Sequence, residues 1–247
     1  MSAVLETRSR YQDLVARAIR ILNSEDVMDY NGHASARDAS DANVIWINNR
    51  LASRSSLTAA DVVPYDLRAG KRIGEGPEPP SEIFIHREIY LRRPDVQGIV
   101  HSHPHHILQL SAAKQTLRPI ASLGSFLPEA GAALFDSTVL INTEQRGIAM
   151  AKALGDGPLV VLRQHGAVAV GESLQEAVVR HIGAELNAIV QFGALQIGDP
   201  NYLAGGELQT LHAENWGAHA TRKAWHYYEE TAYRRGALEG LPAPTGP

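Results

Sequence analysis

The segment 96–106 constrains the chain most, because an apolar run there ends in two histidines at alternate positions, His101 and His103, with Pro104 stopping the strand. Side chains two apart on a β-strand point to the same face of the sheet, and two imidazoles at a strand end form half of a transition-metal site. A lone histidine beside an apolar run is more often a hydrogen-bonded core or surface residue. Two adjacent imidazoles on one face, however, would repel each other if protonated and would need partners if buried. The pattern therefore predicts a metal site at this strand end.

A third histidine, His165, lies in a similar setting. Residues 159–163 have the apolar pattern of a buried strand, and the chain turns through His165 into a second apolar run at 167–171. Taken alone, this histidine could equally be a hydrogen-bonded core residue. The chain nevertheless offers three imidazoles at strand ends. Because it has no cysteine, any metal must be held by His, Asp or Glu.

Length and composition indicate an enzyme-sized globular chain. Its 247 residues are 44% hydrophobic, and we expect one domain over residues 1–247 with a flexible tail at 236–247. No apolar stretch approaches the length of a membrane span, and the amino terminus lacks the basic start and apolar run of a signal peptide, so we expect a cytoplasmic protein. The net charge of −4 and the lack of basic clusters argue against nucleic acid as a partner.

Alternating helix and strand patterns predict an α/β layered fold. Apolar residues at helical spacing indicate an amphipathic helix over 8–22, and Ser81 and Ser173 are suited to cap two later helices. We expect the remaining helices at 81–92, 143–154, 173–197 and 213–235, strands at 44–47, 96–101, 137–141, 159–162 and 167–170, and a loop at 199–211.

Three motifs together resemble the class II aldolase/adducin family, which includes fuculose phosphate aldolase and ribulose phosphate epimerase. They are PSEIFIH at 80–86, RPDVQGIVHSH at 93–103, and QHG at 164–166 followed by a helix that begins SLQEA at 173. Their order and spacing also fit, over residues 8–200. The resemblance implies a three-layer αβα fold with a central, mainly antiparallel sheet. It also implies a small-molecule substrate and a homotetramer with active sites between subunits.

The resemblance also implies the metal ligands and a catalytic carboxylate. It places one divalent cation on His101, His103 and His165. Zinc or manganese suits nitrogen and oxygen ligands, with iron or cobalt as alternatives. It puts Glu82 beside the metal as ligand or acid/base, although a glutamate in a first helical turn can simply favour the helix dipole. Because a carboxylate near a cation stays ionised and can exchange a proton, Glu82 is the predicted catalytic residue.

The chain departs from the family at three contacts that phosphate-using members make with a sugar phosphate. Residues 31–37 read NGHASAR, with His33 where asparagine is expected. Residues 47–55 read INNRLASRS and lack the expected glycine, and a single Ser81 after proline stands in place of two serines. Phosphate recognition is therefore not expected at this pocket.

Arginines near the altered pocket suggest a carboxylate in place of the phosphate. Arg37, Arg50 and Arg54 offer planar guanidinium groups, which pair bidentately with carboxylates. Each could instead be a solvated surface charge. We take these three arginines, together with His33 and Ser81, as candidate substrate-binding residues.

The NGHxSAR form of the first loop is similar to a branch of the family that removes a carboxylate from hydroxylated aromatic dicarboxylates, such as dihydroxyphthalate and hydroxymethylpyridine dicarboxylate. A metal chelated by a ring hydroxyl and the adjacent carboxylate would draw in electron density as carbon dioxide leaves. Retro-aldol cleavage uses the same electron sink, so an aldolase or epimerase acting on a sugar or sugar phosphate stays open as the alternative. A non-enzymatic module of the adducin type is disfavoured, since such members tend to lose ligands and all three histidines are present.

An aromatic-rich segment near the carboxyl terminus supplies the last candidates. Its aromatic side chains could close over a flat ring in the same subunit or a neighbouring one, although such a stripe is more often core or interface. His212 is the candidate proton donor. Phe126, which follows the metal strand, is a candidate pocket residue, with core packing as the alternative.

Overall fold

An eight-stranded mixed sheet forms the centre of the computed structural model, which describes residues 2–244. The strands lie in the order β4-β3-β2-β1-β5-β8-β7-β6, and every neighbouring pair is antiparallel except β6 and β7. The sheet is therefore mainly antiparallel, as expected. The strands are β1 (His33–Arg37), β2 (Val44–Asn48), β3 (Val62–Asp66), β4 (Lys71–Arg72), β5 (Gly98–Ser102), β6 (Ala133–Phe135), β7 (Leu159–Leu162) and β8 (Gly166–Gly171).

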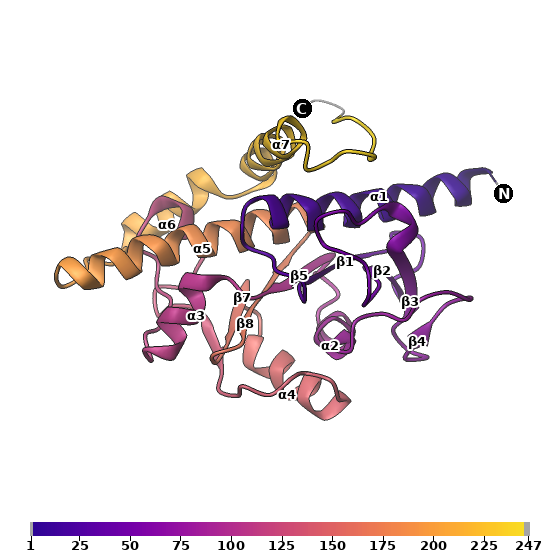
Figure 1. Ribbon diagram of the computed structural model, residues 1–247. Coiled ribbons are helices and arrows are strands. Elements are labelled where there is room, and N and C mark those ends of the chain that lie inside the picture. The colour runs from indigo at the N-terminus through magenta and orange to yellow at the C-terminus, as the bar shows by residue number, and fades with distance from the viewer. Residues whose placement is uncertain (1, 245–247) are drawn as a thin grey trace.

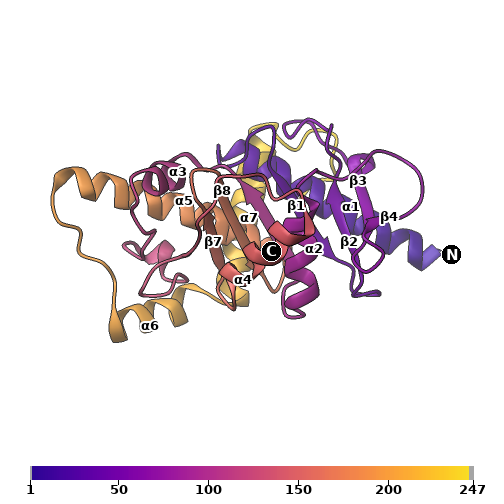
Figure 2. The ribbon, with the colours of Figure 1, turned by 90° about the horizontal axis from the view of Figure 1, so that it is seen from below.

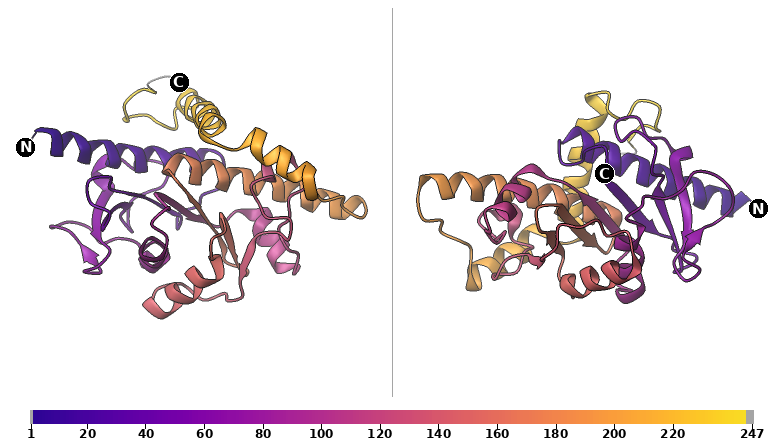
Figure 3. Two further views of the ribbon diagram at one scale, coloured as in Figure 1. Left: turned by 180° about the vertical axis from the view of Figure 1, so that it is seen from behind. Right: turned by 60° about the horizontal axis from the view of Figure 1, so that its bottom comes forward.

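Helices cover both faces of this sheet. The helices are α1 (Ser2–Ser24), α2 (Ile83–Arg92), α3 (His105–Ala112), α4 (Glu144–Leu154), α5 (Leu174–Ile197), α6 (Gly205–Asn215) and α7 (Ala218–Arg234). Figure 1 shows α1 and α5 above the strands and α2 and α4 below them, and the view from below places α2 and α4 in front of the strands (Figure 2). α7 crosses outside α1 and α5, where α6 leads into it (Figure 3).

Side chains on β1 alternate between the two helical layers, as the pleat of a strand requires. Ala34 and Ala36 join the apolar core under α1 and α5. His33 and Ser35 face the opposite way, toward α2. A second apolar core lies between the sheet and the pair α2 and α4. The expected α/β fold with a helical layer on each side of the sheet is confirmed.

The two predicted serine caps have different outcomes. Ser173 caps α5, because its hydroxyl accepts a hydrogen bond from the backbone N–H of Glu176 at 3.1 Å. α2 begins later than expected, at Ile83, and Glu82 occupies the cap position without bonding the helix with its side chain. The carboxylate of Glu82 is therefore free to point elsewhere.

Two element predictions are wrong. The edge strand lies at β6, while 137–141 forms irregular structure in which only Ile141 is buried and its neighbours Val139 and Leu140 are exposed. The predicted loop at 199–211 contains most of α6, in which Leu208 is the one buried residue. An isolated buried position produces no helical periodicity in the sequence, which explains the second error.

None of the helices within residues 2–244 combines the length and the hydropathy needed to cross a membrane. The described part of the segment expected to be a flexible tail packs along α1. Leu238 is buried, and the Arg20 guanidinium donates to the carbonyl oxygens of Ala237 and Glu239 at 2.6 and 2.8 Å. Arg17 donates to the carbonyl of Pro242 at 2.7 Å.

Candidate metal centre

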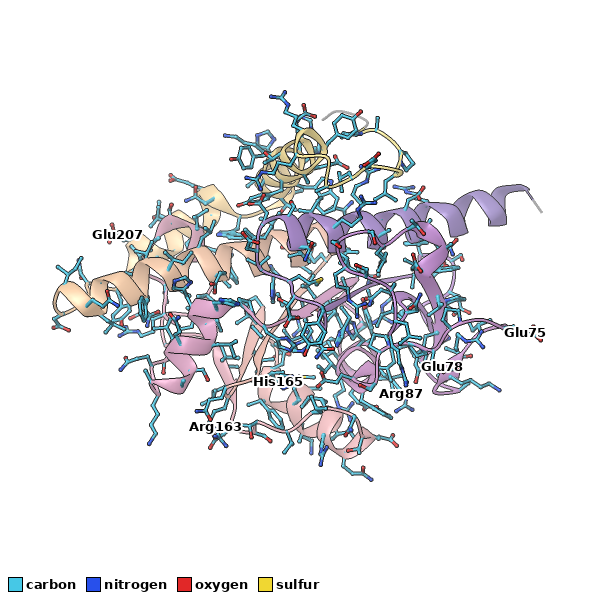
Figure 4. All side chains as sticks on the ribbon, in the orientation of Figure 1. Glu75, Glu78, Arg87, Arg163, His165 and Glu207 are labelled. Atoms are coloured by element: carbon cyan, nitrogen blue, oxygen red, sulfur yellow. The ribbon has the colours of Figure 1, made fainter. Side chains whose placement is uncertain are left out.

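Three histidines converge at one end of two neighbouring central strands of the sheet, β5 and β8. His101 lies on β5, His103 lies directly after it, and His165 lies in the turn between β7 and β8, where Figure 4 labels it. One ring nitrogen from each lies within 4.8 Å of the others. The structure thus brings together the three imidazoles that the sequence placed at strand ends.

Local backbone geometry holds His165 in this position. The N–H of His165 bonds the carbonyl of Leu162 at 3.0 Å, closing a tight turn in which Gln164 has a φ of 52°. The next residue, Gly166, allows β8 to approach β5 closely, since a Cβ there would lie 2.2 Å from the carbonyl oxygen of Ser102. His165 and His103 therefore face each other with their ring centroids 5.3 Å apart.

The free nitrogens of this cluster fit a divalent cation. Nδ1 of His101 bonds the carbonyl oxygen of Ala167 at 3.0 Å, so it must carry the proton and Nε2 keeps its lone pair. That Nε2 and both ring nitrogens of His165 are buried and have no hydrogen-bond partner among the described residues. Buried imidazole nitrogens without partners are costly unless a cation binds them.

Asp29 orients the third imidazole, and the sequence prediction did not include it. Its carboxylate accepts a hydrogen bond from Nδ1 of His103 at 2.9 Å and from the backbone N–H groups of Asn31 and Gly32. A carboxylate bonded to the outer nitrogen of a ligating histidine fixes the ring and its tautomer. The only sequence signal was a carboxylate shortly before the NGH loop, because Asp29 and His103 are far apart in the chain.

Glu82 points into the same cluster. One carboxylate oxygen accepts the N–H of Ile141 at 2.8 Å, and the other lies 3.6 Å from Nε2 of His165 and 3.9 Å from Nε2 of His101. Burial raises the pKa of Glu82, but the nearby His165 and His101 and the Ile141 N–H outweigh this effect and lower the pKa to about 2. The carboxylate is ionised, and it serves the cluster instead of capping α2.

His33 borders the centre from the neighbouring strand. It is the direct cross-strand partner of His101, with ring centroids 4.8 Å apart, and a ligand atom of His33 lies within 4.8 Å of those of Glu82 and His101. Its Nε2 is buried without a partner among the described residues, while Nδ1 contacts Nε2 of His86 on α2 at 2.7 Å. His33 therefore presents one nitrogen to the site.

Of the three candidate arginines, Arg54 lies near these histidines. Arg54 is buried. Burial lowers the pKa of His33 most, the neighbouring imidazoles of His101 and His86 lower it further, and the charge of Arg54 adds to this. Its Nε donates to the carbonyl of Gly32 at 2.6 Å and Nη1 to that of Ala52, whereas Nη2 makes no hydrogen bond with residues 2–244. Arg50 is exposed and bonds the carbonyl of Pro79 at 3.3 Å. Ser81, beside Glu82, is exposed.

The third candidate arginine, Arg37, is wrongly predicted as a substrate contact. It lies at the other end of β1 from His33, and each of its guanidinium nitrogens donates to a backbone carbonyl. The acceptors, at 2.6 to 3.1 Å, are the carbonyl oxygens of Val96, Ala42, Tyr90 and Arg93. Arg37 is a structural residue that ties α2 to the sheet.

His212 and Phe126 also lie away from the histidine cluster of their own chain. Both line a pocket with Gly171, at the opposite end of β8 from Gly166, so the length of this strand, about 17 Å, separates them from the site. Nδ1 of His212 bonds the carbonyl of Ser125, and Phe126 is buried against the ring of Trp216. Within one chain, His212 cannot donate a proton at the histidine cluster.

Comparison with known proteins gives one consistent family. Residues 13–192 match the Class II Aldolase and Adducin N-terminal domain. A 3,4-dihydroxyphthalate decarboxylase of Terrabacter sp. (strain DBF63) is 33% identical over 218 residues, covering 84% of this chain and 87% of the relative. The protein of that name from Rhodococcus jostii (strain RHA1) is 29% identical, covering 82% and 85%. An L-fuculose 1-phosphate aldolase structure from Glaciozyma antarctica has the same fold, with a TM-score of 0.81, 23% identity and coverage of 93% and 91%.

Proposed function

Because the chain belongs to the class II aldolase and adducin family, we propose that it is a metal-dependent lyase that decarboxylates a hydroxylated aromatic or pyridine dicarboxylate. The convergence of three histidines and Glu82, with buried imidazole nitrogens left unpaired, is the observation that carries the proposal. The similarity to 3,4-dihydroxyphthalate decarboxylases supports the choice of reaction.

His101, His103 and His165 are the proposed ligands of one divalent cation, zinc or manganese, with iron or cobalt as alternatives. When bound, the cation supplies a Lewis acid that draws in electron density as carbon dioxide leaves. Asp29 keeps the ring of His103 in place, and the carbonyl of Ala167 keeps the lone pair of His101 directed inward.

The remaining residues bind the substrate and move a proton. Arg54 is the proposed partner of the substrate carboxylate. Its guanidinium group is buried near His33, and its Nη2 has no hydrogen-bond partner among residues 2–244, so this nitrogen is available to donate to the substrate. Arg50 and Ser81 are exposed, and we propose that they contact the substrate at the rim of the site. When the ring–carboxylate bond breaks, its electron pair stays on the ring carbon, which must take up a proton. Glu82 is ionised at rest, so it is the proposed group that accepts this proton from the solvent and passes it to the ring carbon.

We also propose a homotetramer with sites near subunit interfaces. Leu134 on the edge strand and Val139 and Leu140 in the following segment expose apolar side chains, and this segment continues to Ile141, which bonds Glu82. Apolar surface beside a site suits a subunit contact. Sedimentation equilibrium tests the oligomeric state: a tetramer is expected, and a monomer at micromolar concentration contradicts it.

A paired assay tests the reaction itself. The protein loaded with manganese or zinc is mixed with hydroxylated phthalates, benzoates and pyridine dicarboxylates, and carbon dioxide release is measured. Aldehyde release from fuculose and ribulose phosphates is measured in parallel, with His101→Ala as the inactive control. We expect carbon dioxide from at least one ortho-hydroxy dicarboxylate. Aldehyde release without decarboxylation of any ring would replace the proposal with the aldolase alternative.

A further inference from the structure

A row of polar side chains leads from the metal centre into the protein between β1 and α2. Nδ1 of His33 lies 2.7 Å from Nε2 of His86, and Nδ1 of His86 lies 2.6 Å from the hydroxyl of Ser35. That hydroxyl lies 3.0 Å from the hydroxyl of Tyr90, which in turn donates to the backbone carbonyl of Ser35 at 3.1 Å. These four residues are a continuous hydrogen-bonded row.

The regular spacing of two elements builds this row. His33 and Ser35 alternate on β1 and so share one face, whereas Glu82, His86 and Tyr90 are four residues apart and follow one side of α2. All four members of the row are buried. The row therefore ends inside the protein at a peptide carbonyl, and its hydrogen bonds are set by its own members.

Both imidazoles of the row are neutral, because both rings are buried and neither bonds a carboxylate among the described residues that would hold a second proton on it. Each ring then carries a single N–H. Only two hydrogen-bond directions are compatible with this. Either His86 donates to His33, which leaves an N–H on Nε2 of His33, or His33 donates to His86, which leaves a lone pair there.

The two directions differ in how many contacts they satisfy. If His86 donates to His33, Ser35 must donate to His86, and the single Tyr90 proton cannot serve both the Ser35 hydroxyl and the Ser35 carbonyl. If His33 donates to His86, then His86 donates to Ser35, Ser35 to Tyr90, and Tyr90 to the carbonyl. Every contact in the row then has its proton. Fully satisfied buried networks are favoured, since each buried unmade bond carries a free-energy cost.

We infer that His33 presents a hydrogen-bond acceptor to the metal centre and selects a substrate with a hydroxyl group at that position. The inference rests on the proposed function and adds to it: His33 reads the ring hydroxyl, and Arg54 reads the carboxylate. His86, Ser35 and Tyr90 are positioning residues that set the tautomer of His33. A carboxylate or a phosphate dianion has no proton to donate, so its oxygen is disfavoured beside this nitrogen.

Imidazole ¹⁵N chemical shifts in the metal-free protein test the tautomer directly. Long-range ¹H–¹⁵N spectra of the ¹⁵N-histidine-labelled chain distinguish a protonated from a bare ring nitrogen, and a His33→Gln spectrum identifies the signals of His33. We expect Nδ1 of His33 to be protonated and Nε2 to be bare. A protonated Nε2, or equal populations of both tautomers, would overturn the inference. The spectrum reports the tautomer of His33 whether or not the protein decarboxylates any ring. The inference about His33 and the proposed function can therefore fail separately.

Ligand binding tests the selectivity. Calorimetry compares 3-hydroxyphthalate with 3-methoxyphthalate, in which a methyl group replaces the hydrogen that His33 would accept in a hydrogen bond. We expect the wild-type protein to prefer the hydroxyl compound by about tenfold or more, because the ether leaves the acceptor unpaired. In His33→Asn, whose amide can donate, the preference should fall to within about threefold. An unchanged preference in the variant, or none in the wild type, contradicts the role of His33.

Discussion

β1 carries a polar side chain at each end, Arg37 at one and His33 at the other. The two side chains differ in how many of their polar atoms have a hydrogen-bond partner within the protein. At one end, Arg37 has all of its guanidinium nitrogens bonded to backbone carbonyls. At the other end, His33 lies beside His101, and each of His33, His101 and His165 has a buried ring nitrogen without a hydrogen-bond partner in residues 2–244. Burial alone therefore does not identify function. Several buried imidazole nitrogens that are left unpaired at one place do, because a ligand bound there would compensate their desolvation.

The largest expected effect is the removal of an unpaired imidazole. His101→Ala and His165→Ala should each weaken metal binding by more than about 10²-fold and abolish turnover. Removing a residue that only orients a metal ligand costs about 10- to 100-fold in metal affinity, and removing the ligand itself should cost more. Metal content after dialysis measures this. His105→Ala, an exposed histidine close in sequence, is the matched control and should keep both metal and activity. Full metal occupancy in both ligand variants would place the site elsewhere.

The next effect separates proton transfer from metal binding at Glu82. Glu82→Gln keeps the shape of the side chain and its contact with the Ile141 N–H but removes the charge. We expect turnover to fall by about 10²-fold or more while metal binding is lost only in part. Single-turnover rates at saturating metal give the comparison. Turnover within a few-fold of wild type would limit Glu82 to a structural role at the start of α2.

A smaller effect is expected at Asp29, which acts on the metal only through His103. Asp29→Asn removes the carboxylate that orients the ring and should reduce metal affinity by about 10- to 100-fold. Titration with a competing chelator measures the affinity. Asp26→Asn is the control, since Asp26 is a nearby acidic residue outside the cluster. Equal affinities in the two variants would show that Asp29 does not support the site.

The smallest functional effect is expected when either of two buried arginines, Arg54 or Arg37, is replaced by lysine. Arg54→Lys keeps the charge but loses the forked donor, so the KM for an aromatic dicarboxylate should rise several-fold. Its melting temperature should fall as well, because the carbonyls of Gly32 and Ala52 lose their donors. Arg37→Lys should lower the melting temperature further and leave the KM unchanged, because a lysine cannot bond all of its carbonyl partners and each unpaired buried acceptor costs about 1–3 kcal/mol. Kinetics and thermal unfolding of both variants test this. A raised KM in Arg37→Lys without lower stability would reverse the assignment.

The sequence predicted that the three histidines come together, because each lies at or directly after the end of a short, strongly apolar strand. β5, β7 and β8 are buried, and their ends locate His101, His103 and His165 without knowledge of the full fold. The same argument should have excluded Arg37. Four residues along a strand separate it from His33 by about 13 Å, so the two cannot line one small pocket.

Other features depend on contacts that no local pattern contains. Asp29 reaches His103 only through the packing of distant segments. β1 was not predicted, because HASAR lacks the branched and aromatic residues typical of strands. His212 was misplaced for a related reason: α6 buries little, so neither its existence nor its position at the far end of β8 follows from periodicity.

Anomalous diffraction from crystals grown with manganese tests the metal assignment most directly. We expect one peak per chain, within about 2.3 Å of a ring nitrogen of each of His101, His103 and His165. A peak at another position, or crystals that contain manganese but show no peak beside these three rings, would contradict the assignment.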